Sequence, residues 1–514
     1  MLLTLLFFLP LFGAVALQFF EEKQAFWLHQ AATGIAALPL CLGFLVWWNF
    51  APEFSGVQMG TNLVWFSLPL GKRTLVVHYA LGVDGIRLLP TLLMSGMGLW
   101  VLRSAQQHSP ESPRSFYFFV LSTQSALLGA VLAQDLLLLA FFWQWALFGL
   151  FFLLGSWGKN AEKAALRMFL FLTAGALLFQ VALWTIGVQS GTLLLSKLAS
   201  HKLSQDWLRW LLPLALLGIL PSLLWFPLHS WWHEVNVHTP KYLRPLWLQG
   251  VFPLGAVLLM SVVVPVFAPV WSGAVSVLTF FAVLGVVVGA CLTLVETREG
   301  TPWTSVSLTM MSLVCLGILC TEVGAWQGAL LLLCHHSLAI GALQELHHWR
   351  ESHTTEPSAN PQLPQEDADA SFVQGCTRFA FFRWVLVLSL VGIPGFAGFA
   401  SLWLLVSGGW QTSGWLALFL AVGGGLLTLS LLPRLWTTPA DSVIDAQPLS
   451  PALVTLLMVV LLLQIWMGLS PGQLLAPTQR TLHKTLSPFR KHQKTGALKV
   501  QKIRSTRYVA RGEN

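Results

Sequence analysis

The sequence predicts an all-α integral membrane protein of about fourteen membrane-spanning helices, some of them broken. Hydrophobic residues make up 55% of the 514 residues and charged residues only 10%, and the mean hydropathy is +0.69. This is too little polar surface for a water-soluble protein of that length. Many apolar runs also reach the roughly 20 residues that a helix needs to cross the hydrocarbon layer. No soluble domain of ordinary size fits between them.

Apolar runs of spanning length divide the chain into blocks. We expect spans at residues 2–18, 28–49, 86–103, 115–134, 136–155, 165–188, 207–227, 243–268, 271–295, 303–321, 325–346, 379–405, 412–433 and 451–470. The blocks are two N-terminal spans (1–50), a surface loop with a possible hairpin (51–84), a core bundle (85–350) with a broken helix near 221–227, a flexible polar loop (351–378), three last spans (379–470) and a basic tail (471–514). An even number of spans places both termini on the same side of the membrane.

Two long connections interrupt the apolar pattern. Residues 51–83 alternate apolar and polar residues around Gly60 and Gly71-Lys72, which indicates a hairpin lying on the membrane surface. Residues 351–370 are rich in Pro, Ser, Glu and Asp, which is typical of a flexible loop.

The formal net charge of +8 is concentrated at the C-terminus, where ten Lys and Arg and one Glu follow from Arg480 onward. A basic segment after a last span is typical of the cytoplasmic face and of contact with anionic lipid, and a solvated, partly disordered tail is the simpler interpretation. Because the charge lies in a tail, it does not indicate a nucleic-acid partner. The six cysteines lie scattered without metal-ligand spacing, so we expect no metal. We also expect no cofactor in this chain.

Prolines inside spans predict broken helices, because each removes a backbone hydrogen bond that lipid cannot replace. Pro221 and Pro227 interrupt the seventh span, Pro253 lies within the eighth, and Pro394 interrupts the twelfth. Broken helices at membrane depth often line transport paths. A kink that serves only packing is the alternative.

Ionisable residues at membrane depth are candidates for an ion path, because a charge there costs several kcal/mol. His336 lies inside the eleventh span with a second histidine beside it, and a proton relay and a neutral, hydrogen-bonded histidine both fit. Asp135 lies where the fourth and fifth spans meet, and Glu345 lies near a span end, so interfacial positions suit both. His229 and Glu234 lie in the loop after the broken seventh span.

Several motifs carry a resemblance to a known family. They are LGVDGIRLLPTLL (81–93), AQDLLLLAFFWQWALFGLFFLLGSWG (133–158), AALRMFLFLTAGALL (164–178), FPLHSWWHEVNVHTP (226–240), TSVS (304–307), HHSL (335–338) and GIPGFAGF (392–399). Together they resemble the antiporter-like membrane subunits of respiratory complex I, the family of NADH-quinone oxidoreductase chain M and the multisubunit cation antiporters. The resemblance extends over most of the chain and includes the span count and the broken seventh helix.

The resemblance implies a line of ionisable residues across the membrane middle: a glutamate on the fifth span, lysines on the seventh and eighth, a histidine on the tenth and a lysine or glutamate on the twelfth. Here those positions hold Gln144, Ser222, Pro253, Leu308 and Leu402, and only the eleventh-span histidine remains, as His336. A polar route through Gln144, Ser222 and His336 can still conduct passively. Side chains that cannot gain or lose charge cannot drive proton movement electrostatically. We therefore expect the channel of this chain to be altered or silent.

The resemblance also implies partners and a location. These are other membrane subunits of a multisubunit complex, lipid, and a quinone-reducing arm or a large soluble partner, in the cell inner membrane. We expect a membrane-arm subunit of a complex I-like, proton- or cation-translocating complex. The alternatives are a subunit of an inorganic-carbon uptake or cation antiporter complex, or a purely structural paralogue. No Ser/His/Asp or paired-carboxylate arrangement indicates an enzyme.

Overall fold

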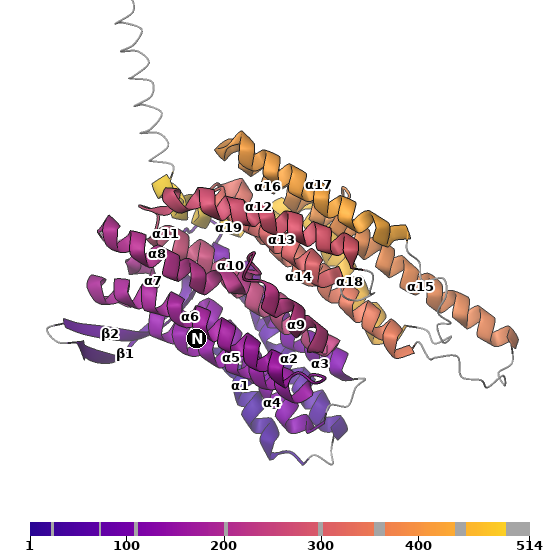
Figure 1. Ribbon diagram of the computed structural model, residues 1–514. Helices are drawn as coiled ribbons and strands as arrows, with labels where there is room; N and C mark the ends of the chain where they lie inside the picture. The colour runs from indigo at the N-terminus through magenta and orange to yellow at the C-terminus, as the bar shows by residue number, and fades with distance from the viewer. Residues whose placement is uncertain are drawn as a thin grey trace, which may run out of the picture.

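The computed structural model describes residues 1–21, 25–70, 73–106, 111–199, 204–296, 302–353, 365–436 and 449–489, which form a long helical bundle with one hairpin (Figure 1). Its first half contains α1 (Leu2–Ala16), α2 (Ala25–Trp48), β1 (Gln58–Leu70), β2 (Arg73–Val83), α3 (Gly85–Ala105), α4 (Pro113–Leu132), α5 (Leu136–Trp157), α6 (Glu162–Ser190), α7 (Leu195–Leu198), α8 (Gln205–Ile219) and α9 (Ser230–His238). Its second half contains α10 (Phe252–Leu258), α11 (Val264–Val266), α12 (Trp271–Val295), α13 (Pro302–Leu319), α14 (Val323–His353), α15 (Gln365–Val391), α16 (Ala397–Thr412), α17 (Gly414–Trp436), α18 (Pro451–Leu469) and α19 (Pro471–Thr485).

Twelve helices in the described part of the chain are long and apolar enough to cross a membrane. The prediction of a multi-pass, all-α membrane protein is therefore confirmed. Helix α13 is a shorter apolar helix, and the twelfth predicted span is divided between α15 and α16. The count of about fourteen spans stays a prediction, because these elements do not meet the same criteria.

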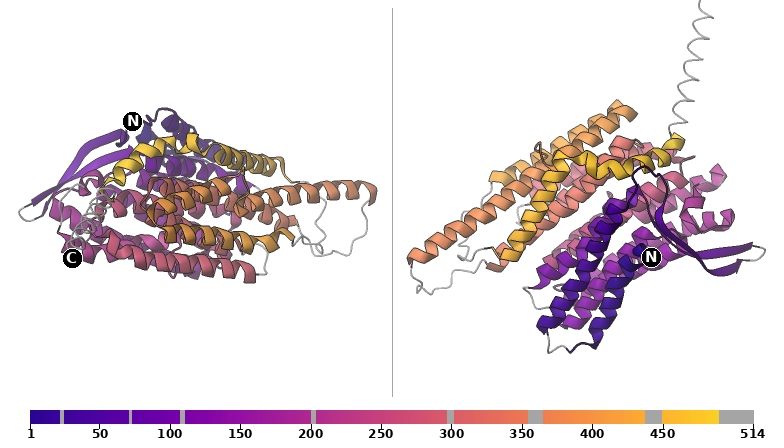
Figure 2. Two further views of the ribbon diagram at one scale, coloured as in Figure 1. Left: turned by 90° about the horizontal axis from the view of Figure 1, so that it is seen from above. Right: turned by 180° about the vertical axis from the view of Figure 1, so that it is seen from behind.

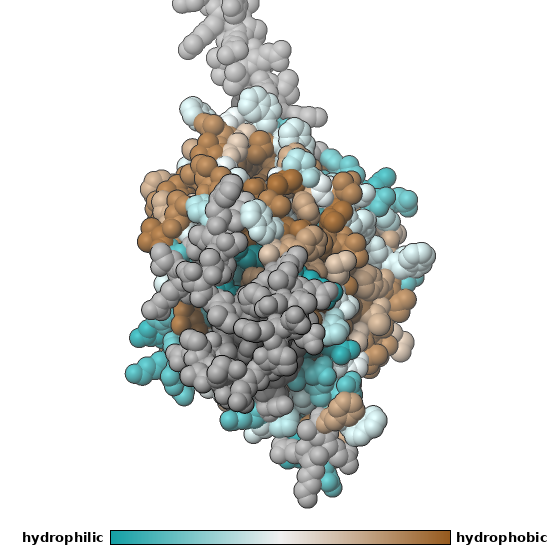
Figure 3. Space-filling model, turned by 90° about the vertical axis from the view of Figure 1, so that its right-hand side faces the viewer, coloured by the Kyte–Doolittle hydropathy of each residue, from teal (hydrophilic) through white to brown (hydrophobic). Residues whose placement is uncertain are grey.

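The outer surface of the bundle is apolar. Large side chains such as Phe280 (63% exposed), Trp410 (73%) and Leu462 (60%) point outward from the peripheral helices, where lipid or neighbouring proteins can cover them. Figure 3 views the bundle from the right-hand side of Figure 1 and shows brown, apolar surface on the flanks, with hydrophilic side chains scattered around the grey residues. Seen from behind, the N-terminal helices and α15–α17 lie on opposite flanks (Figure 2).

At one end of the bundle, the segment from β2 to the start of α3 contacts both the first helix, α1, and the last described helix, α19. Thr4 of α1 accepts a 3.2 Å hydrogen bond from the Tyr79 hydroxyl of β2. The amide of Gly85, which follows β2, donates to the Thr481 hydroxyl of α19 at 3.2 Å. The antiparallel hairpin of β1 and β2, which pairs Leu70 with Arg73 at its turn, projects from the same end (Figure 1).

The seventh span is broken where its prolines lie. Helix α8 ends in a 3-10 turn, Leu220–Leu223, and α9 begins only at Ser230. The carbonyl of Pro221 accepts two 3.2 Å hydrogen bonds, one from the Leu224 amide that closes the turn and one from the Trp231 indole. The indole thus links α9 to the end of the broken helix, in keeping with the need to pair backbone groups in the membrane interior.

The twelfth span is broken between α15 and α16. Gly392 and Gly395 on either side of Pro394 have φ of +85° and +97°, values that only glycine adopts readily. The Val391 carbonyl at the end of α15 accepts a 2.9 Å hydrogen bond from the Thr428 hydroxyl of α17.

Pro253 differs from the other two prolines, because the chain stays helical around it. A π-helical turn, Trp247–Val251, leads directly into α10, where Pro253 occupies the first turn. Proline removes one amide from the helical ladder, and the turn before it is π-helical instead of α-helical. The predicted break is therefore a π-helical irregularity within a continuous span.

Two predicted segments contain more helix than expected. Helix α14 continues to His353 and α15 begins at Gln365, so helix occupies both ends of the predicted polar loop, and residues 354–364 lie outside the described residues. The helix resumes directly after the last proline of that stretch, Pro364. Likewise, α19 occupies the beginning of the predicted basic tail, whose remainder from residue 490 lies outside the described residues.

Candidate functional site

His336 is the best-defined polar residue of the predicted path. It is fully buried on α14, and its Nε2 lies 2.9 Å from the Ser307 hydroxyl of α13. The ring of Phe252 on α10 lies 6.1 Å from the imidazole. The other ring nitrogen, Nδ1, has no hydrogen-bond partner among the described residues. The site is a neutral hydrogen-bonded pair with one unused nitrogen.

Ser222 and His336 both contact helix α10. It is 4% exposed, in the 3-10 turn after α8, and a Cβ placed on Gly255 of α10 would lie 3.0 Å from its own Cβ. Helix α10 therefore contacts Ser222 at Gly255 and His336 at Phe252. The seventh-span and eleventh-span positions are brought together around α10, whose own position in the line is occupied by Pro253.

Gln144 lies on α5, in the part of the bundle formed by α4, α5 and α6. Its side chain is half-buried, and its Nε2 has no partner in the part of the chain that the structure describes. An amide can donate and accept hydrogen bonds, but it has no charged form at physiological pH. Gln144 can therefore bind water without titrating.

Leucines occupy the remaining two positions of the implied line, where they serve packing. Leu308 on α13 is 2% exposed. A Cβ on Gly392 or Gly424 would lie 3.3 or 3.4 Å from Leu402, so this side chain fills the space beside the broken twelfth span. Neither residue can hold or transfer a proton.

A second neutral cluster was missed by the sequence analysis. Nδ1 of His335 lies 2.6 Å from Oε1 of Gln464 on α18, which also accepts from the Ser389 hydroxyl of α15 at 3.4 Å. All three residues are fully buried. They fasten α14 to α18 and α15 next to the second helix break.

Asp135, one of the predicted path residues, caps a helix and contacts the hairpin. The residue is 0% exposed. Its Oδ1 accepts from the Leu137 amide at 2.9 Å and so caps α5, and its Oδ2 accepts from the His78 amide of β2 at 3.1 Å. Burial raises the pKa of Asp135, while the backbone amides oppose that shift. The carboxyl joins the hairpin to the bundle.

Glu234 and His229 lie after the broken seventh span. They are not among the implied positions Gln144, Ser222, Pro253, Leu308, His336 and Leu402, which we call the buried line. Glu234 on α9 forms a 2.6 Å ion pair with Arg167 on α6, and both side chains are substantially exposed, at 40% and 69%. Such a pair adds little stability where it is solvated. His229 is half-buried and stacks on Phe226 with ring centres 5.5 Å apart.

Charged residues that the sequence analysis did not connect gather near one end of the bundle. Glu345 on α14 is 6% exposed, and the charges of Arg244 and Lys241, at the beginning of the eighth span, act on its carboxyl. Arg244 donates to the Asn236 carbonyl at 2.6 Å, and Asn236 donates to Thr304 at 2.6 Å. Lysine and arginine directly before an apolar run are the sequence signal for this cluster.

The arrangement supports hydrogen bonding rather than charge relay in the membrane middle. The neutral groups of Gln144, Ser222 and His336 can bind water, and the charged cluster around Glu345 lies toward one end. Among the residues that the structure describes, no three His, Cys, Asp or Glu side chains are grouped as a metal ion would require.

Comparisons with known proteins agree on one family. The family model described as NADH:quinone oxidoreductase/Mrp antiporter, TM, matches residues 133–428, more than half of the chain. NADH-quinone oxidoreductase subunit M of Rhodobacter capsulatus is 25% identical over 461 residues, which cover 85% of each chain.

Two solved structures share the fold. A chain of respiratory complex I from Thermus thermophilus with bound NADH superposes with a TM-score of 0.77 at 22% identity, covering 95% of this chain and all of that one. The Mrp complex from Dietzia sp. gives 0.76 at 17% identity, covering 93% of this chain and 52% of that one.

Proposed function

Because the chain belongs to the NADH:quinone oxidoreductase/Mrp antiporter family of membrane proteins, we propose that it is a membrane-arm subunit of a complex I-like, proton- or cation-translocating assembly in the cell inner membrane. Its similarity to subunit M along most of both chains supports this assignment. Its partners are then other membrane subunits, and an arm that reduces quinone or a large soluble protein supplies the energy.

The surface of the hairpin suits such an assembly. Leu63, Val64 and Trp65 of β1 are 60%, 69% and 60% exposed, and the hairpin projects beyond the helices (Figure 1). An exposed run of apolar residues on a strand is unfavourable in water and favours contact with a partner.

We further propose that the chain's own channel is altered or silent. The observation that carries this proposal is the neutrality of the buried line: glutamine, serine, proline and two leucines occupy positions where the family resemblance implies ionisable groups. Electrostatic coupling needs groups whose charge changes, since only a differential interaction can shift a distant equilibrium. A row of neutral groups conducts water-borne protons passively at most.

Purification of the intact complex, followed by identification of its subunits, tests the assignment to an assembly. Co-purification of other complex I chains supports the membrane-arm function. A set of cation antiporter subunits supports the second candidate, for which the Mrp complex provides a comparable fold. A chain that purifies without membrane partners contradicts both.

Restoration of charge tests the silent channel. The double variant Gln144→Glu, Ser222→Lys returns two ionisable groups to the buried line. If the chain is a purely structural paralogue, the assembled complex containing this variant moves no more protons in vesicles than the original complex. An increase in proton movement would instead show a path that is disabled only by these substitutions, and the chain would then not be purely structural.

A further inference from the structure

A cavity of about 940 Å³ lies between the two flanks of the bundle. It is lined by residues of α2, α3, α14 and α18, together with Leu474 of α19. Its volume is in the upper part of the range of small-molecule sites. The lining residues of α2 extend from Gln30 to Trp47, a rise of roughly 25 Å along a helix, so the cavity follows most of the membrane thickness.

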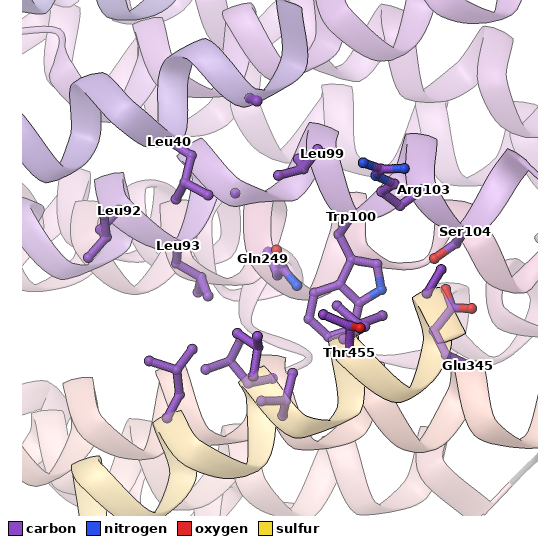
Figure 4. A pocket seen from close by; sticks show the side chains of 18 of the residues that line it. Leu40, Leu92, Leu93, Leu99, Trp100, Arg103, Ser104, Gln249, Glu345 and Thr455 are labelled. Atoms are coloured by element: carbon purple, nitrogen blue, oxygen red, sulfur yellow. The ribbon is translucent and has the colours of Figure 1, made fainter. Parts of the chain in front are cut away.

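The two ends of the cavity differ in chemistry. Leu40, Leu92 and Leu93 lie toward one end, whereas Arg103, Ser104 and Glu345 lie toward the other (Figure 4). Ser104 and Trp100 face the Glu345 carboxyl. A cavity with a long apolar body and one polar end is complementary to an amphiphile.

One oxygen of Glu345 and the amide nitrogen of Gln249 are buried polar atoms in the wall, although Ser104 and Trp100 bond the Glu345 carboxyl. Glu345 is 6% and Gln249 1% exposed, and Oε1 of Glu345 and Nε2 of Gln249 have no hydrogen-bond partner among the described residues. Both residues line the cavity. Because unpaired buried polar atoms are costly, they indicate a ligand that offers a donor at Glu345 and an acceptor at Gln249.

We propose that this cavity binds a diacyl phospholipid with a primary-amine headgroup. The ammonium group would donate to Glu345, the phosphate would lie at Arg103, an ester carbonyl would accept from Gln249, and an acyl chain would occupy the apolar body. The lining contains one guanidinium, one carboxyl and the His348 imidazole, and the guanidinium and carboxyl match the two charges of a zwitterionic headgroup. Arg244 lies outside the lining and already bonds the Asn236 carbonyl.

Native mass spectrometry of the full-length chain, purified in a mild detergent and exchanged with phosphatidylethanolamine or phosphatidylglycerol, tests the proposal. We expect one phosphatidylethanolamine to remain bound, about tenfold more tightly than phosphatidylglycerol, the difference that one charge-assisted hydrogen bond provides. Glu345→Gln should abolish this preference. Its matched control, Glu162→Gln on the exposed surface of α6, should preserve it.

A cavity-filling variant tests the location. Gly34 lines the cavity, and a Cβ there meets nothing within 4 Å, so Gly34→Leu places a side chain in the cavity without a clash and should eliminate lipid retention. Gly273→Leu, at an equally open glycine on α12, should leave retention unchanged. Equal retention of both lipids by the original chain, or retention by Gly34→Leu, overturns the proposal. So does efficient cross-linking of a Gly34→Cys variant to a neighbouring subunit in the intact complex.

Discussion

Replacing Asp135 by alanine should release the hairpin from the bundle. The substitution removes both acceptors, at 2.9 Å from the Leu137 amide and at 3.1 Å from the His78 amide. A hydrogen bond to a charged acceptor contributes about 1.5 to 3 kcal/mol, so opening of the hairpin contact should become easier by at least about 1.5 kcal/mol. Hydrogen exchange of the His78 amide should then accelerate by about tenfold or more.

The exchange measurement has a matched control and a clear contrary outcome. Asp206 on α8 is 87% exposed and lies 3.7 Å from Arg209, so Asp206→Ala should leave exchange of the His78 amide unchanged. Unaltered exchange of that amide in Asp135→Ala would show that the carboxyl does not hold the hairpin in place.

The pH dependence of an Asp135→Asn variant follows from the same burial. Burial raises the pKa of Asp135, so the folded state binds this proton more tightly than the unfolded state does. The stability linked to this proton is present below the unfolded-state pKa and is lost as the pH rises through the folded-state pKa. The destabilisation of Asn relative to Asp should therefore be largest at low pH and should shrink as the pH rises.

Three further substitutions test the packing around the breaks, each measured by thermal unfolding of the purified protein. Thr428→Val removes the 2.9 Å hydrogen bond to the Val391 carbonyl and should destabilise the protein by about 1 kcal/mol. Gly218→Leu should prevent folding, because a Cβ there lies 2.5 Å from a backbone nitrogen of α6. Gln464→Leu leaves His335 without its 2.6 Å partner and should cost about 1 to 3 kcal/mol.

The spans could be predicted because lipid imposes a length and a composition that a single pass along the chain detects. Helix α19 could not be distinguished from the predicted basic tail in the same way. Its buried Leu474, Thr478 and Leu482 recur at helical spacing, but the charge run that begins at Arg480 obscured this pattern. A helix that is apolar on one face only gives a much weaker signal than a span.

Features of the candidate site could be predicted only where all the residues involved lie in one short segment of the sequence. The break at Pro221 and the neutrality of the buried line follow from the sequence itself. The capping of α5 and the link to the hairpin depend on Asp135 meeting a strand 57 residues away. Likewise, Glu345 meets Arg244 only through the packing of two spans. Contacts between distant segments leave no local pattern, so sequence alone suggested an ionic role for Asp135.

The account's central claim is that the buried line does not carry a driven proton. The most direct test replaces its single titratable residue, His336, by glutamine, which can still bond the Ser307 hydroxyl. The measured quantity is the number of protons moved per substrate turned over by the intact complex in sealed vesicles. The account predicts the same ratio for His336→Gln as for the original chain, whereas a ratio lower by a whole proton would contradict it.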